Sequence, residues 1–300
     1  MRAVATAAPA DAQYDRVIAL GLEEDAPWGD ITSELLLPES SIAHANLVAR
    51  EPGVLAGVRA FERTMAIVDP TIEVVLHVAD GSSVAPGTVV ASVVGPARGV
   101  LRAERLALNI VQRMSGIATE TARYVLLVAD TRARIVDTRK TTPGLRVLEK
   151  YAVRCGGGSN HRFSLSDAVL AKDNHLGLIS AHEGLDLAQL LRHTRAQLPH
   201  TMRIEVEVDR IDQVEPVLAG GADIIMLDNF TLPQLREAVA LIGGRALIEA
   251  SGGVTLETVT EIAATGVDLI SVGALTHSVR ALDLGLDLDI ELGEGAAGRP

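Results

Sequence analysis

The chain has 300 residues, is 48% hydrophobic but only 2% aromatic, and carries a formal net charge of −12. An acidic chain with few aromatic residues is a poor partner for nucleic acid or for an anionic membrane surface, and no apolar run approaches the roughly 20 residues that span a bilayer. The one cysteine, Cys155, excludes an internal disulfide framework and is typical of a reducing compartment, so we expect a cytoplasmic protein.

The first part of the chain predicts a mainly antiparallel sheet with one or two helices. Residues 1–13 are expected to be a disordered tail, and apolar spacing indicates a helix from Tyr14 to Glu24. A stripe of apolar residues from Leu106 to Ala118 predicts a second helix, which runs on past a break at Gly116 towards Asp130. Further short elements are expected at 31–37, 42–50, 54–58, 71–78 and 88–94.

Beyond residue 130, strand-like runs alternate with helix-compatible stretches. This alternation predicts an α/β fold in which a parallel sheet with right-handed crossovers forms a closed or nearly closed barrel. The strands are expected at 133–137, 168–172, 203–208, 223–227, 246–250 and 268–272. The helices are expected at about 144–154, 183–197, 210–219, 231–242 and 255–264.

Polar residues gather where these six predicted strands end. In α/β barrels the carboxyl ends of the strands form the rim on which active sites are built. The strand from 133 ends in Thr138, Arg139 and Lys140, and the strand from 168 ends in Lys172. The other ends carry Glu207, Asp228, Ser251-Gly252-Gly253 and Ser271-Val272-Gly273. The six ends together predict a single site.

Basic residues dominate the segment from Asp137 to His175, although the chain as a whole is acidic. Arg139 and Arg162 offer planar forks suited to carboxylate or phosphate, while Lys140 and Lys172 are compact point charges. His161 follows a glycine loop and is equally consistent with a ligand-binding role or a structural one. The alternative for all of these cations is a solvated charged face, but a bound polyanion is the simpler explanation.

Two carboxylates and two glycine turns complete the predicted site. Glu207 and Asp228 next to a polyphosphate could hold Mg²⁺, brace ribose hydroxyls or stabilise a cationic sugar; alternatively, they only pair with the nearby bases. Ser251 to Gly253 and Gly273 precede predicted helices, where backbone N–H groups can approach a phosphate. The residues therefore predict a polyphosphate with magnesium, beside a second anion held by arginine and histidine. A zinc site is not expected.

The same residues carry a resemblance that covers nearly the whole chain. The chain resembles the quinolinate phosphoribosyltransferase family, also called nicotinate-nucleotide pyrophosphorylase (carboxylating). TRKTTPG at 138–144, GGGSNHR at 156–162 and KDNH at 172–175 are the most specific segments, and Ser164 departs from the glycine expected there. The other segments are EDAPWGDITSELL, REPGVLAG, RAERLALNIVQRMSGIAT, EVEVD, MLDN, ASGG and VGALTHS.

The resemblance implies a reaction and a set of site residues. Quinolinate and phosphoribosyl pyrophosphate would give nicotinate mononucleotide, pyrophosphate and CO₂, with Mg²⁺ as cofactor. Lys140, Lys172, Glu207 and Asp228 are the implied catalytic residues. The quinolinate carboxylates would be bound by Arg139, His161, Arg162 and Lys172, with Thr138 also at the substrate. Lys140 would contact the pyrophosphate, Glu207 and Asp228 would serve Mg²⁺ and ribose, and Ser251, Gly252, Gly253, Ser271, Val272 and Gly273 would hold the 5′-phosphate.

The resemblance also implies an assembly and a domain plan. Arg105 would reach the site of the partner subunit, which makes a homodimer part of the site. An N-terminal α+β open sandwich is expected over 14–115, joined by the segment 276–290. A TIM-like barrel is expected over 116–275, and a second disordered tail over 291–300.

Three alternatives remain. A paralogue associated with molybdenum transport shares much of this pattern and would act on a different acceptor. An aldolase would use Lys140 or Lys172 as a Schiff-base lysine. A non-catalytic anion-binding protein would bind phosphate without any magnesium-dependent release of CO₂.

Overall fold

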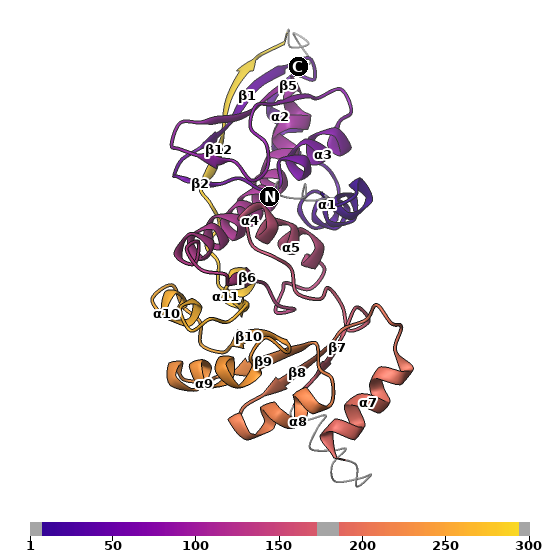
Figure 1. Ribbon diagram of the computed structural model, residues 1–300. Coiled ribbons are helices and arrows are strands. Elements are labelled where there is room, and N and C mark those ends of the chain that lie inside the picture. The colour runs from indigo at the N-terminus through magenta and orange to yellow at the C-terminus, as the bar shows by residue number, and fades with distance from the viewer. Residues whose placement is uncertain (1–7, 173–185, 294–300) are drawn as a thin grey trace. The chain divides into compact units, whose positions relative to one another are not determined.

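The computed structural model describes residues 8–172 and 186–293 (Figure 1). Contacts divide the chain into two compact units. The first unit contains the described residues up to 122, the segment 141–157 and the residues from 276 onwards, and the second contains 123–140 and 158–275. None of the helices in the described ranges combines the length and apolar character of a membrane span.

An antiparallel sheet forms the centre of the first unit. Its strand order is β12-β1-β5-β3, and β12 pairs with β1 along its whole length, from Ile42 opposite Glu291 to Ala49 opposite Leu284. Side chains such as Leu47 and Phe61 are fully buried between the sheet and its helices. The strands are β1 (Ile42–Ala49), β2 (Gly53–Val54), β3 (Glu73–Leu76), β4 (Ser83–Val84), β5 (Val89–Pro96) and β12 (Leu284–Glu291). The helices are α1 (Asp11–Asp25), α2 (Ile31–Leu36), α3 (Val58–Val68), α4 (Ala97–Leu127) and α5 (Arg146–Cys155); the last residues of α4, from 123, are counted in the second unit.

The helices of this unit differ from the expectation in three places. α1 begins at Asp11, inside the predicted tail, because the Gln13 side chain accepts from the Ala10 backbone N–H and caps the first turn. The predicted strand at 54–58 is only β2, since the left-handed turn at Gly57 starts α3 directly. α4 is not broken at Gly116. The tails at 1–7 and 294–300 lie outside the described residues.

The segment 141–157 belongs by its contacts to the first unit, although the sequence placed it in the barrel. Arg113 on α4 donates to the buried Glu149 carboxylate at 2.9 Å. The Tyr151 hydroxyl donates to Asp80 at 3.0 Å. These bonds hold α5 against α4 and the loop before β4.

A six-stranded parallel sheet forms the second unit and confirms the predicted α/β class. Its order is β6-β11-β10-β9-β8-β7, so β6 and β7 are its two ends; a single bridge from Val136 to Ser159 lies beyond β6. Helices α7 to α10 follow one another along the outside of the sheet (Figure 1). The strands are β6 (Arg134–Val136), β7 (Val169–Ala171), β8 (Ile204–Val208), β9 (Ile224–Asp228), β10 (Leu247–Ser251) and β11 (Leu269–Ser271). The helices are α7 (Leu187–Gln197), α8 (Val214–Ala219), α9 (Leu232–Ile242) and α10 (Val259–Ala263), with a 3₁₀ turn η1 (Ile211–Gln213) before α8. The short helix α11 (Ala274–His277) follows β11 across the boundary between the units.

Strand alternation sorts the side chains of this sheet onto two faces. On β8, Ile204, Val206 and Val208 are buried on one face, so Glu205 and Glu207 share the other. Glu207 is in register with Met226 on β9, which is in register with Glu249 on β10. Polar side chains from neighbouring strands therefore lie on one face, close to the carboxyl ends of the strands.

Candidate active site

A cavity of about 420 Å³ opens at the carboxyl ends of the parallel strands. It lies wholly within the second unit, and most of the predicted site residues line it. The lining residues are Thr138, Arg139, Lys140, His161, Arg162, Leu170, Lys172, Glu207, Met226, Asp228, Ser251 and Ser271. Because both cations and carboxylates face one space, this cavity is the candidate active site.

Two guanidinium groups crowd one side of the cavity. Arg162 donates to the backbone oxygen of Ala168 at 2.9 Å. Burial, together with the nearby charge of Arg139, lowers the pKa of Arg162. The Nε of Arg139 is buried and has no hydrogen-bond partner in the described part of the chain. A buried donor without a partner, beside a second like charge, is satisfied by a bound anion.

Lys172 and two carboxylates lie in the cavity with the arginines. Lys172 Nζ lies 2.6 Å from Glu207 Oε2, so the alternative of acid–base pairing is correct for this contact. Asp228 ends β9 opposite Ser251 of β10, and its carboxylate accepts from the Asn229 amide at 2.7 Å. Oxygen ligands on neighbouring strands are a donor set that fits Mg²⁺, which is bound through one or two carboxylates and substrate phosphates.

The glycine turn after β10 packs closely against the end of β9. Gly252 has φ +95°, and a Cβ there would lie 2.9 Å from the backbone nitrogen of Asn229. Asn229 itself has φ 57°, and its backbone N–H donates to the Ser251 oxygen at 2.9 Å. Gly253, at φ +61°, faces open space. Only glycine fits position 252, so this turn holds Ser251 and Asp228 in place.

The turn after β11 is fixed in a different way. Ser271 lines the cavity, while the next residue, Val272, is buried and donates its backbone N–H to the Val136 oxygen at 3.0 Å. Gly273 then directly precedes α11. Gly252, Gly253, Val272 and Gly273 are therefore adjacent to the cavity lining without being part of it.

The remaining predicted residues occupy different positions. Lys140 is exposed at the rim, and its backbone N–H donates to the Thr138 hydroxyl at 3.0 Å. Arg105 is an exposed residue of α4 in the first unit and is not among the residues that line the cavity. Asn174 and His175, at the end of the KDNH segment, lie outside the described residues.

Sequence reasoning missed a buried acidic layer beneath the cavity. Asp137 is fully buried and accepts from the His161 backbone N–H at 2.9 Å and from the Asn160 amide at 2.5 Å. Glu205 and Glu249 are also buried. Burial, and then the proximity of Glu205, raises the pKa of Glu249. The available signal was an acid at an alternating position inside an otherwise apolar strand, as in Leu247-Ile248-Glu249-Ala250.

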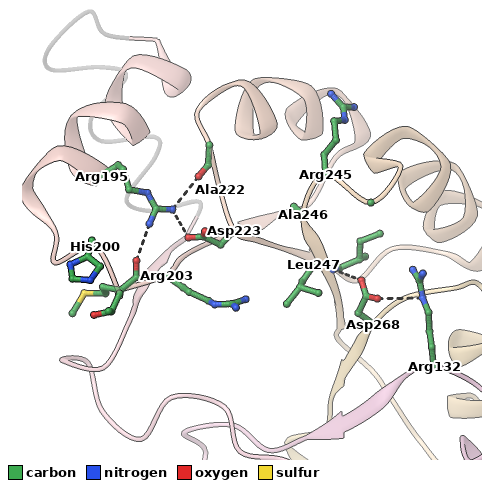
Figure 2. Close-up of a pocket in the computed structure, with 15 residues that line it drawn as sticks. Arg132, Arg195, His200, Arg203, Ala222, Asp223, Arg245, Ala246, Leu247 and Asp268 are labelled. Carbon is green, nitrogen blue, oxygen red and sulfur yellow. Dashed lines mark hydrogen bonds and ion pairs between the residues drawn. The ribbon is translucent and has the colours of Figure 1, made fainter.

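A larger cavity, of about 780 Å³, lies around the amino ends of the same strands (Figure 2). Two of its arginines pair with acids that also brace the strands. Arg195 pairs with Asp223, which accepts from the Ile204 backbone N–H at 2.7 Å. Arg132 lies 3.3 Å from Asp268, which accepts from the Ile248 N–H. These two ion pairs therefore have a structural role at the amino ends of the strands.

Comparisons of sequence and structure relate the chain to known proteins. The sequence models of the N-terminal and C-terminal domains of quinolinate phosphoribosyl transferase match residues 30–115 and 117–287. The chain is 44% identical to nicotinate-nucleotide pyrophosphorylase (carboxylating) of Mycobacterium leprae, over 93% of this chain and 99% of that protein. It is 41% identical to the probable nicotinate-nucleotide pyrophosphorylase (carboxylating) of Bacillus subtilis, over 89% of this chain and 90% of that protein. The solved structure of NadC from Streptococcus pyogenes superposes with a TM-score of 0.89 at 38% identity, covering 96% of this chain and all of that one.

Proposed function

The chain belongs to the quinolinate phosphoribosyl transferase family, and we propose that it transfers the phosphoribosyl group of phosphoribosyl pyrophosphate to quinolinate with loss of CO₂. The products are nicotinate mononucleotide, pyrophosphate and CO₂. The single observation that carries this proposal is the cavity in which Arg139 and Arg162 face the carboxylates of Glu207 and Asp228. Nothing in the comparisons favours the molybdenum-transport alternative.

Quinolinate binds at the side of the cavity with the two arginines. Its two carboxylates pair with the guanidinium groups of Arg139 and Arg162 and with the ammonium of Lys172, next to Thr138. The unpartnered Nε of Arg139 supports this assignment, because it is a buried donor that a carboxylate would satisfy. The pKa of Arg162 is lowered by burial and by the like charge of Arg139, and a bound anion would offset both. Lys172 is held by Glu207, so its charge is already directed into the cavity.

Phosphoribosyl pyrophosphate binds along the carboxyl ends of β8 to β11. Lys140 contacts the pyrophosphate, and the turns Ser251 to Gly253 and Ser271 to Gly273 hold the 5′-phosphate. Glu207 and Asp228 hold Mg²⁺ and the ribose hydroxyls; the ion, when bound, neutralises charge on the departing pyrophosphate. The support is the carboxylate pair on adjacent strands and the close packing at Gly252.

The residues stabilise charge rather than form a covalent bond to the substrate. Loss of pyrophosphate leaves an oxocarbenium-like ribose, which the carboxylates of Glu207 and Asp228 stabilise in a preorganised site. The quinolinate nitrogen then attacks the ribose carbon that pyrophosphate has left, and the ring becomes a cationic pyridinium. The electron pair left when CO₂ departs lies next to that cation, and a proton from solvent completes the nicotinate ring.

The active protein is a cytoplasmic homodimer in this proposal. Arg105, exposed on α4, reaches the quinolinate site of the partner subunit. The match of RAERLALNIVQRMSGIAT to the family supports the homodimer and the role of Arg105. The single cysteine of the chain supports the cytoplasmic location.

One assay tests the function. The purified protein is incubated with quinolinate, phosphoribosyl pyrophosphate and magnesium, and nicotinate mononucleotide and CO₂ are measured. We expect both products in equal amounts, and neither when any one component is omitted. Consumption of phosphoribosyl pyrophosphate only with a different acceptor would favour the molybdenum-transport alternative, and no consumption at all would leave anion binding without catalysis.

A further inference from the structure

Two buried carboxylates, Glu205 and Glu249, meet the partly exposed ring of His161 directly beneath the cavity. His161 Nε2 lies 2.9 Å from Glu205 Oε2 and 3.8 Å from Glu249 Oε1. The Ser271 hydroxyl donates to Glu249 from the neighbouring strand. Neither Glu205 nor Glu249 lines the cavity. The cluster therefore connects the cavity to the sheet interior through His161.

Both ring nitrogens of His161 are bonded within the protein. The Arg162 backbone N–H donates to Nδ1 at 2.7 Å, so Nδ1 is an acceptor and carries no hydrogen. The ring hydrogen of a neutral imidazole is then on Nε2, from which it donates to Glu205. His161 lines the cavity, but both of its hydrogen-bonding positions are already used. Its role in the site is consequently different from that of an arginine.

The loop that carries Arg162 is fixed from two sides. Asp137, at the end of β6, binds the loop through the His161 backbone N–H and the Asn160 amide. Glu205, on β8, binds the His161 ring. Three strands separate β6 from β8 in the sheet order, so the two acids attach the loop to two distant parts of the sheet. Arg162 is the next residue after this double attachment.

Burying two carboxyl groups side by side is costly unless both are used. Glu205 and Glu249 are 4% and 1% exposed, and no basic residue other than His161 forms an ion pair with either one among the described residues. Hydrophobic side chains would fill these positions at no such cost. The pair therefore has a function other than stability.

We propose that Glu205 and Glu249 are positioning residues for quinolinate: acting through the His161 ring, they fix the loop so that the Arg162 guanidinium is held at the substrate carboxylate. Glu205 accepts from His161 Nε2. Glu249, held by Ser271, lies beside it and limits where the Glu205 carboxyl group can move. This inference rests on the proposed function, because quinolinate is the ligand whose binding it explains.

The test separates the hydrogen bond from the shape of the side chain. Glu205→Leu keeps most of the volume and removes the acceptor, Glu205→Asp keeps the charge but withdraws the acceptor, and Glu205→Gln keeps an acceptor at full reach. We expect Glu205→Leu and Glu205→Asp to raise the KM for quinolinate about tenfold or more, since a displacement of about 1 Å in a binding group can change rates up to about 100-fold. The KM for phosphoribosyl pyrophosphate stays within about twofold, because His161 does not touch that end of the site. Glu205→Gln restores a KM close to that of the wild type.

A spectroscopic readout makes the result independent of catalysis. The ¹⁵N resonances of the His161 ring, assigned by their loss in His161→Gln, report which nitrogen carries the hydrogen. We expect the Nε2–H form in the wild type and in Glu205→Gln, and a change in both Glu205→Leu and Glu205→Asp. Glu215→Gln, which alters an exposed acid paired with Arg245 on the same unit, leaves the spectrum and both KM values unchanged.

Several results would overturn the proposal. One is an unchanged KM for quinolinate in a folded Glu205→Leu or Glu205→Asp protein. Another is an equal rise in both KM values, which indicates a general structural role. A third is a stoichiometric transition metal that survives chelation and is lost in Glu205→Leu, because His161, Glu205 and Glu249 lie close enough together to bind an ion. If the wild type does not turn over quinolinate at all, the proposed function fails. The ¹⁵N spectrum then still shows whether Glu205 determines which ring nitrogen of His161 carries the hydrogen.

Discussion

At the scale of single residues, the candidate site is a concentration of positive charge that the protein leaves partly unsatisfied. Arg139 has a buried Nε with no partner in the described ranges, and burial together with the nearby charge of Arg139 lowers the pKa of Arg162. Lys172, in contrast, is paired with Glu207. The arginines therefore account for the attraction of a dicarboxylate, and Lys172 is oriented before the substrate arrives.

Arg139→Ala tests this charge directly. We expect the variant to lower kcat/KM about 100-fold or more, because removing one partner of a buried charge pair costs roughly 2–5 kcal/mol and each 1.4 kcal/mol is a factor of ten. Lys172→Ala gives a loss of the same order. Steady-state kinetics measure the effect and circular dichroism checks the fold. Arg236→Ala, which removes an exposed arginine of α9, is the matched control, and wild-type efficiency in either site variant would count against the assignment.

The sequence allowed some of these residues to be predicted and not others. Arg139 and Asp228 were found because polar residues that follow a buried apolar run mark the end of a strand. Glu249 was missed as a buried group because alternation alone does not reveal which face of a strand is interior. Arg105 gives no signal of its own on an exposed helix face, and only the family resemblance singles it out.

At the scale of elements, the positions of most helices and strands can be predicted from the periodicity of the apolar residues, and the exceptions have local causes. The parallel strands β8, β9 and β10 lie within a residue or two of their predicted positions, since each is a short run rich in apolar residues between turns. α3 was not predicted: its start depends on the left-handed conformation of Gly57, which a sequence pattern does not show. Gly116 was predicted to break the helix, but α4 continues through it, and the backbone of Arg280 and Ala281 packs closely against it.

Gly116→Ala tests that contact. A Cβ at this position would meet the backbone oxygen of Arg280, and its distance to the Cα of Ala281 would be 3.1 Å. We expect a loss of about 1–3 kcal/mol from overpacking, which outweighs the roughly 1 kcal/mol that alanine gains in helix propensity. Thermal unfolding measures the change. Gly99→Ala on the same helix is the control, because its Cβ would meet only side chains at 3.1 Å or more; a Gly116→Ala protein as stable as Gly99→Ala would contradict the account.

The turn after β10 gives a second test at this scale. Alanine at either position must adopt a left-handed conformation, which costs about 1–2 kcal/mol of stability. In Gly252→Ala the new Cβ also collides with the Asn229 backbone, whereas in Gly253→Ala it meets no atom. We expect Gly252→Ala to raise the KM for phosphoribosyl pyrophosphate much more than Gly253→Ala, because it displaces Ser251 and Asp228. Equal KM values in the two variants would show that the close packing at 252 does not shape the site.

At the scale of the whole molecule, the dimer proposed for this chain makes a sharp prediction about shared sites. Arg105→Ala and Lys172→Ala subunits are co-expressed with different tags, and the mixed dimer is purified through both. If Arg105 serves the partner's site, one of the two sites in the mixed dimer is intact, and we expect about half of wild-type activity from two nearly inactive parents. A mixed dimer no more active than its parents would place Arg105 in its own subunit's site or outside the reaction.

The central claim is that quinolinate is held between Arg139 and Arg162 at the carboxyl ends of the parallel strands. A crystal structure of the protein with quinolinate bound tests this claim most directly. We predict that both carboxylates lie in the smaller cavity, with one paired to Arg139 Nε. Quinolinate bound instead among Arg195, Arg203 and Arg245, in the larger cavity at the amino ends of the strands, would contradict the account.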